Sequence, residues 1–116
     1  LDANAATGMP ARIRFTFEAA QSLPQLPTAH PCHHIHGHSY RIEVGAADLD
    51  ALEPQLSALY DVLDHRYLND IAGLEQATCE RICEWMWRWL EARGTTPTAV
   101  VVQETDTARC IYRGEA

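Results

Sequence analysis

Hydrophobic and polar residues alternate in two stretches of the first half of the chain, 12–18 and 39–44. The hydrophobic members are Ile13, Phe15 and Phe17 in the first stretch and Tyr40, Ile42 and Val44 in the second. Because neighbouring side chains of a strand point to opposite sides, each stretch predicts a strand with one buried face. The loop that joins them carries three prolines and most of the histidines.

The middle of the chain has helical periodicity instead. Leucines recur every three or four residues, at Leu49, Leu52, Leu56, Leu59 and Leu63. This spacing places all five on one side of a helix, so the segment predicts an amphipathic helix with a single buried stripe.

A second helix is expected to begin after Thr78, a good N-cap residue, and to end at Gly94. We expect its buried side to consist of Ile82, Trp85, Met86 and Trp89. Trp87 falls outside that stripe, so it either contacts another subunit or is simply exposed.

Residues 98–102 are mostly β-branched, and 109–113 form a second short β-type run after a polar connector. The order β-β-α-α-β-β predicts an α+β fold in one domain spanning 1–116. We expect a four-stranded antiparallel sheet with both helices on one face. Open sheet edges are commonly covered by another subunit, so a homo-oligomer is expected. Residues 1–10 are expected to be a flexible N-terminal extension without the features of a signal peptide.

Composition narrows the possible partners. The formal net charge is −7, and all nine basic residues are arginines. This balance argues against nucleic acid as the main partner, but a few arginines could still hold a small phosphorylated substrate. No run approaches the roughly 18 apolar residues of a membrane helix. Cys79 and Cys83 lie four apart in a predicted helix rather than in a disulfide framework, which favours a cytoplasmic protein with reduced thiols.

Five of the six histidines fall between positions 30 and 38. His36 and His38 are two apart, so on a strand their rings point to the same side, and Gly37 leaves space between them. Imidazoles at this spacing are ordinary zinc ligands. The alternatives are a solvated polar loop or a leftover affinity tag. A tag fits poorly, because the cluster is internal and leads directly into an alternating strand.

Cys32 lies in the same proline-bounded loop, where nearby cationic groups or a metal would favour its reactive thiolate form. The other three cysteines are interpreted as small buried hydrophobic residues. Asp64 precedes His65 and could orient its imidazole for acid–base chemistry, although such pairs often serve only as helix caps. Glu104 follows a buried strand and could accept two N–H groups from a heterocycle.

In this order, the segments resemble the 6-pyruvoyl/6-carboxy-tetrahydropterin synthase family. The matching segments are 15–20 (Phe-Thr-Phe-Glu-Ala-Ala), 32–40 (Cys-x-x-x-His-Gly-His-Ser-Tyr), 63–70 (Leu-Asp-His-Arg-Tyr-Leu-Asn-Asp), 104–105 (Glu-Thr) and 110–115. The bacterial carboxy-forming branch, which feeds queuosine synthesis, is more similar than the animal pyruvoyl branch.

The resemblance implies a tunnelling fold (T-fold), whose units form barrels, usually in a hexamer. It also implies a lyase that converts 7,8-dihydroneopterin triphosphate to 6-carboxy-5,6,7,8-tetrahydropterin, with release of acetaldehyde and triphosphate. Under this resemblance Cys32 is the proton-abstracting base and His65 its relay partner, oriented by Asp64. Glu104 and Thr105 would bind the pterin.

The resemblance further implies a zinc cofactor held by His36 and His38. The family's third ligand is a histidine at the position where this chain has Gln21, and an amide is a poor zinc ligand. We expect His34 to be the replacement, ahead of Gln21, because it shares strand parity with His36 and His38. The connection between positions 44 and 48 is also shorter than the family's hairpin, which leaves the oligomer size open.

Two other functions remain. One is a folate-pathway paralogue with aldolase-type cleavage, which Cys32 argues against because that branch typically has a glutamate near this position. The other is a non-catalytic pterin-binding or assembly subunit, which Gln21 makes plausible.

Overall fold

The structure is a computed structural model that describes residues 2–3 and 12–114. The strands are β1 (Asp2–Ala3), β2 (Arg12–Gln21), β3 (His36–Gly45), β4 (Arg66–Tyr67), β5 (Ala99–Gln103) and β6 (Arg109–Tyr112). The helices are α1 (Leu49–Leu63) and α2 (Cys79–Ala92), with short 3-10 turns η1 (Pro31–His33) and η2 (Leu68–Asp70). The predicted N-terminal extension lies outside the described residues, apart from the two that form β1.

The four predicted strands form a continuous antiparallel sheet in the order β2-β3-β5-β6. Two short strands were not predicted: β1 pairs antiparallel with β2, and β4 pairs parallel with it. The β2–β3 pairing runs from Arg12 opposite Gly45 to Gln21 opposite His36. Both strands are therefore longer than the sequence predicted, and the extra length brings part of the histidine cluster onto the sheet.

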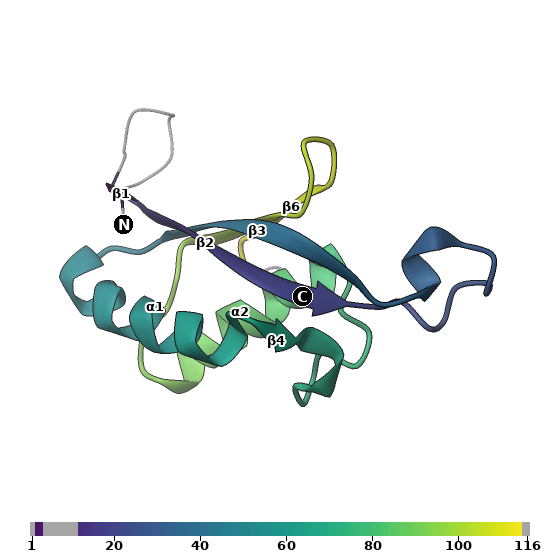
Figure 1. The fold of residues 1–116 in the computed structure, drawn as a ribbon. Helices are drawn as coiled ribbons and strands as arrows, with labels where there is room; N and C mark the ends of the chain where they lie inside the picture. The colour runs from purple at the N-terminus through teal and green to yellow at the C-terminus, as the bar shows by residue number, and fades with distance from the viewer. Residues whose placement is uncertain (1, 4–11, 115–116) are drawn as a thin grey trace.

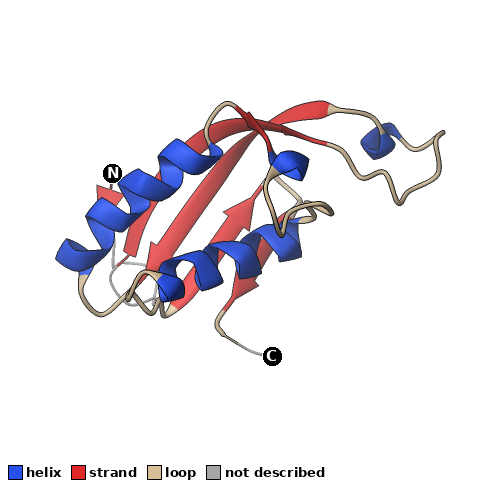
Figure 2. Ribbon diagram, turned by 90° about the horizontal axis from the view of Figure 1, so that it is seen from below, coloured by secondary structure: helices blue, strands red, loops and turns tan. Residues whose placement is uncertain are grey.

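Both helices cover the same face of the sheet, as predicted (Figures 1 and 2). The carboxylate of Asp48 caps α1 by accepting from the Ala51 amide at 3.1 Å, and Thr78 caps α2. The stripe of α1 is buried as predicted, except that Leu49 is only half-buried. No helix among the described residues is long and apolar enough to cross a membrane.

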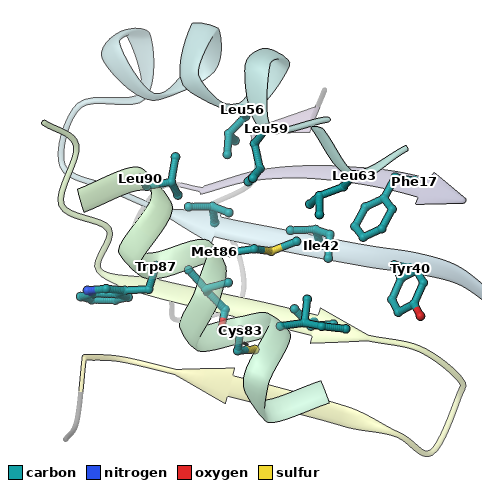
Figure 3. Packing of buried hydrophobic residues seen from close by; sticks show 14 of the residues in the cluster. Phe17, Tyr40, Ile42, Leu56, Leu59, Leu63, Cys83, Met86, Trp87 and Leu90 are labelled. Carbon is teal, nitrogen blue, oxygen red and sulfur yellow. Dashed lines mark hydrogen bonds between the residues drawn. The ribbon is translucent and has the colours of Figure 1, made fainter. Parts of the chain in front are cut away.

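The buried side of α2 differs from the prediction. It consists of Ile82, Cys83, Met86, Trp87 and Leu90 (Figure 3). Trp85 and Trp89 are only half-buried, whereas Trp87 is 8% exposed and packs edge-on against Tyr112 at 5.3 Å between ring centroids. The expectation that Trp87 lies outside the core is wrong, because β6 packs against α2 and covers that side of the helix.

Candidate active site

His36 and His38 lie at the start of β3, on the face that the helices cover further along the sheet. Their rings meet edge to face, with centroids 4.8 Å apart. His36 Nδ1 lies 2.8 Å from the carbonyl oxygen of His34, so this nitrogen carries the proton and donates it. His36 Nε2 is buried and has no hydrogen-bond partner. Its lone pair is thus available to a metal ion or to an N–H donor.

Glu104 reaches the same face from the other side of β3. The last residue of β5, Gln103, pairs with Arg41, so Glu104 comes level with Tyr40. Burial raises the pKa of the Glu104 carboxyl group, and a hydrogen bond from Gln21 and the nearby His36 partly offset that rise. Its Oε1 atom is buried without a partner. The carboxyl group therefore presents one unused acceptor.

Thr105 shapes the turn that follows Glu104. Its hydroxyl accepts from the backbone amide of Ala108 at 3.0 Å, and Glu104 N donates to the Ala108 carbonyl at 3.0 Å. The Thr105 side chain is exposed and engaged in its own turn, and its predicted contact with a pterin stays a prediction.

Asp64 and His65 form a dyad immediately after α1. His65 Nδ1 donates to Asp64 Oδ2 at 2.6 Å, and Asp64 Oδ1 accepts from the Glu18 amide at 2.9 Å. The Glu18 amide is the largest cause of the lowered pKa of Asp64, and His65 also contributes. The carboxylate therefore stays charged and fixes the His65 tautomer, which leaves Nε2 as a free acceptor on a ring whose side chain is 79% exposed.

The backbone of His65 is in the left-handed region, with φ of 58°, which is uncommon for a residue other than glycine. The His65 amide donates to the carbonyl of Glu18 at 2.5 Å. Together with the Asp64 contact, this bond fastens the dyad to β2. The sheet therefore sets the position of the His65 ring.

An open groove of about 540 Å³ brings the dyad together with part of the histidine cluster. Its lining consists of Glu18, Ala19, Ala20, Gly37, His38, Ser39, His65, Arg66 and Tyr67. The Ser39 hydroxyl hydrogen-bonds the Glu18 carboxylate, at 2.6 Å to Oε2. Sequence reasoning did not identify Glu18 or Ser39 as site residues. Their signal was the β2–β3 pairing itself, which places them opposite each other.

Cys32 is not part of this groove. It lies in η1, within the loop 22–35 that extends away from the rest of the fold (Figure 1). Its amide donates to His30 Nδ1 at 3.1 Å, and its carbonyl accepts from Leu23 N at 2.8 Å. Burial, the largest cause, raises the pKa of Cys79 to about 12, which is consistent with its interpretation as an unreactive thiol.

The predicted zinc site depends on how the histidine side chains are placed. Among the described residues, no three His, Cys, Asp or Glu side chains converge as a metal site. His36 fits a ligand role, since metal-bound imidazoles usually donate their second N–H to a carbonyl. Burial and then His36 lower the pKa of His38, which favours its neutral, metal-binding form.

Both residues considered as a third zinc ligand are engaged in other hydrogen bonds. His34 Nε2 lies 3.1 Å from the Thr28 carbonyl oxygen, so its ring is turned into the loop rather than toward His36 and His38. Gln21 Oε1 accepts from the hydroxyl of Tyr40 at 2.7 Å. His36 and His38 therefore present two neighbouring imidazoles, and the role of His34 stays a prediction.

Comparison with solved structures identifies the class to which this fold belongs. The solved structure of 6-pyruvoyl tetrahydropterin synthase from Caenorhabditis elegans superposes with a TM-score of 0.76, at 23% identity, covering 90% of this chain and 94% of that one. The 6-pyruvoyl tetrahydropterin synthase of Plasmodium falciparum superposes with a TM-score of 0.55, at 13% identity, covering 88% and 96%. The predicted T-fold is confirmed.

The sequence comparisons are more specific. The sequence profile of the 6-pyruvoyl tetrahydropterin synthase family matches residues 11–115. The chain is also 36% identical to the 6-carboxy-5,6,7,8-tetrahydropterin synthase of Synechocystis, over 84% of this chain and 88% of that protein. The chain belongs to the 6-pyruvoyl tetrahydropterin synthase family.

Proposed function

We propose that this protein is a lyase of the 6-carboxy-tetrahydropterin synthase type. It converts 7,8-dihydroneopterin triphosphate to 6-carboxy-5,6,7,8-tetrahydropterin and releases acetaldehyde and triphosphate. The observation that carries this proposal is the 36% identity to the Synechocystis synthase over most of both chains. The chain also has a thiol, an Asp–His dyad and a half-buried carboxylate for the required chemistry.

Each of the proposed site residues has a separate role in this reaction. Glu104 anchors the pterin, because its unpaired Oε1 can accept an N–H group from the ring edge. His65 moves a proton through its free Nε2, while Asp64 holds the ring and stabilises its charged form. Cys32 acts as the base that removes a proton from the substrate side chain. In one chain Cys32 does not line the groove of His65, so the proposed oligomer, a hexamer by resemblance, would bring the loop 22–35 to a groove.

His36 and His38 are proposed as the zinc ligands of this chain. Bound zinc would polarise the side-chain oxygens of the substrate and so acidify the neighbouring C–H bond. The lone pair on His36 Nε2 supports this assignment. His34 remains a less favoured third ligand, for which the loop would have to rearrange.

The test is direct conversion of 7,8-dihydroneopterin triphosphate by the purified protein. Mass spectrometry should identify the 6-carboxy product, and a coupled alcohol dehydrogenase assay should detect acetaldehyde. A matched variant, His65→Asn, should be folded and nearly inactive. Formation of a pyruvoyl product or of a different aldehyde would refute the carboxy-forming assignment, the latter in favour of the aldolase-type paralogue. Pterin binding without any conversion would instead favour the non-catalytic subunit.

A further inference from the structure

A buried chain of polar side chains crosses three strands beside the candidate pterin anchor. Tyr40 is 0% exposed and Gln21 is 2% exposed, so neither has access to water in this structure. The Tyr40 hydroxyl donates to Gln21 Oε1 at 2.7 Å. The sheet register places Glu104 level with Tyr40, and the Gln21 side chain partly offsets the burial-driven rise in the pKa of the Glu104 carboxyl group. Three residues, from β2, from β3 and from the position just after β5, are thereby brought together.

The direction of each bond follows from the chemistry of the groups. Because the oxygen of the Gln21 amide already accepts from Tyr40, its NH₂ group faces the remaining partner, the Glu104 carboxylate, which accepts. A histidine or a hydrophobic residue at position 21 could not accept from a hydroxyl and present an NH₂ pair in the same way. The amide is thus matched to both of its neighbours.

The row of polar side chains is held in place at its Tyr40 end. The Tyr40 ring stacks on Phe17 with centroids 4.8 Å apart and an interplanar angle of 11°, and the two rings lie side by side in Figure 3. This packing fixes the hydroxyl, the hydroxyl fixes the rotation of the Gln21 amide, and the amide then fixes Glu104. Buried polar groups that are all satisfied hold one arrangement strongly, because each alternative leaves a group unpaired.

Two hydrogen-bond acceptors have no partner at the Glu104 end of this row of polar side chains. They are Oε1 of Glu104 and Nε2 of His36, both buried and without partners. His36 is the direct β-sheet partner of Gln21. We propose that Gln21 is a positioning residue that holds Glu104 beside His36 and thereby sets the affinity for a flat heterocycle with an N–H-rich edge. This inference rests on the proposed function, because it takes the pterin as that heterocycle.

The competing role for Gln21 is that of a third metal ligand. The two roles predict opposite effects of Gln21→Glu. A carboxylate is a better zinc ligand than an amide, so in the ligand role this variant would retain zinc more tightly against a chelator. In the positioning role it loses the NH₂ donor and places a second carboxylate against Glu104, so affinity for the heterocycle falls.

A double-mutant cycle measures the positioning role. The variants are Gln21→Met, Tyr40→Phe and the combination, and the probe is neopterin, which carries no phosphates and is followed by calorimetry. We expect Gln21→Met to weaken binding about tenfold or more, the effect of losing a hydrogen bond to a charged group. Tyr40→Phe should weaken binding about threefold, and it should have no further effect once Gln21 is replaced.

Several outcomes would overturn the inference. Gln21→Met with wild-type affinity is one, and equal effects of Tyr40→Phe in both backgrounds is another. Tighter zinc with unchanged neopterin affinity in Gln21→Glu is a third. Gln21→Met alone leaves the Tyr40 hydroxyl unpaired and could unfold the protein. The double variant removes both partners and so remains a usable measurement of the same loss.

The experiment separates this inference from the lyase proposal. Wild-type protein that binds neopterin but does not convert the triphosphate would refute the lyase and leave the role of Gln21 intact. If wild-type protein does not bind neopterin, the pterin function itself fails. The contact between Gln21 and Glu104 can then be tested by NMR spectroscopy. The side-chain NH₂ resonances of Gln21 should shift in Glu104→Ala, and unchanged resonances would refute the contact.

Discussion

Replacing Glu104 by glutamine should lower pterin affinity without lowering the stability of the free protein. The substitution keeps the size of the side chain but turns one carboxylate oxygen into an NH₂ donor. Oε1 is a buried acceptor without a partner, and the Gln21 side chain lies near enough to the carboxyl group to affect its pKa. The variant can still pair with Gln21 through its remaining oxygen, so the NH₂ group faces the site where the N–H groups of a pterin would lie.

The magnitude follows from the kind of hydrogen bond that is lost. A hydrogen bond to a charged group contributes about 1.5–3 kcal/mol, so its loss raises the dissociation constant about 10- to 150-fold. Stability of the free protein should stay the same or rise slightly at neutral pH. Burial disfavours the charged form of Glu104, and the neutral amide removes that cost.

Neopterin binding by calorimetry and urea unfolding by circular dichroism measure the two effects. Glu80→Gln is the matched control, since Glu80 is an exposed carboxylate whose charge acts on Glu104 from the first turn of α2. It makes the same change in net charge without removing the acceptor, so its affinity should stay within about twofold of wild type. Unchanged affinity in Glu104→Gln, or an equal loss in Glu80→Gln, would show that Glu104 does not contact the pterin.

Four further predictions address other parts of the chain. Cys32→Ala should fold normally and lose activity about 100-fold or more in a product assay, and wild-type turnover would exclude Cys32 as the base. His34→Ala should leave zinc affinity unchanged in a chelator competition, because its ring is bonded to the loop; weaker zinc would restore it as the third ligand. Trp87→Ala should cost about 3–5 kcal/mol in urea unfolding, and Trp89→Ala clearly less, because only Trp87 is buried; the reverse order would support the sequence-based stripe. Folding lowers the pKa of Asp64, so its contribution to stability is present above the unfolded pKa and is lost as the pH falls through the folded pKa. In Asp64→Asn, the urea unfolding midpoint should therefore depend less on pH below about pH 4 than it does in the wild type. An unchanged pH dependence would contradict the role of Asp64.

The sequence determined the elements of this fold because their signals are local. Alternation predicted β2 and β3, leucine spacing predicted α1, and Thr78 marked the start of α2. Side-chain periodicity depends only on the geometry of a single strand or helix, so one chain segment suffices to predict it. The family motifs likewise lie in short stretches, which is why family membership could be predicted before the fold was known.

The choice of buried residues on α2 required the tertiary structure. Spacing allows several neighbouring stripes on a helix with three tryptophans, and only the position of β6 decides that Trp87 is covered. The lengths of β2 and β3 were also undecided by sequence, because polar residues at a strand end do not alternate with hydrophobic ones. Pairing with the partner strand is what extends them to Gln21 and His36.

The site shows the same division. The sequence predicted roles for His36, His38, His65 and Glu104 from their residue types and motifs, and it predicted His34 as a third metal ligand from strand parity. The backbone of His34 is extended, but the residue lies before β3 begins and its ring is bonded to the Thr28 carbonyl in the loop. The contacts of Gln21 with Tyr40 and Glu104 join residues far apart in the chain. Only the folded sheet brings them together, so no local pattern in the sequence could predict them.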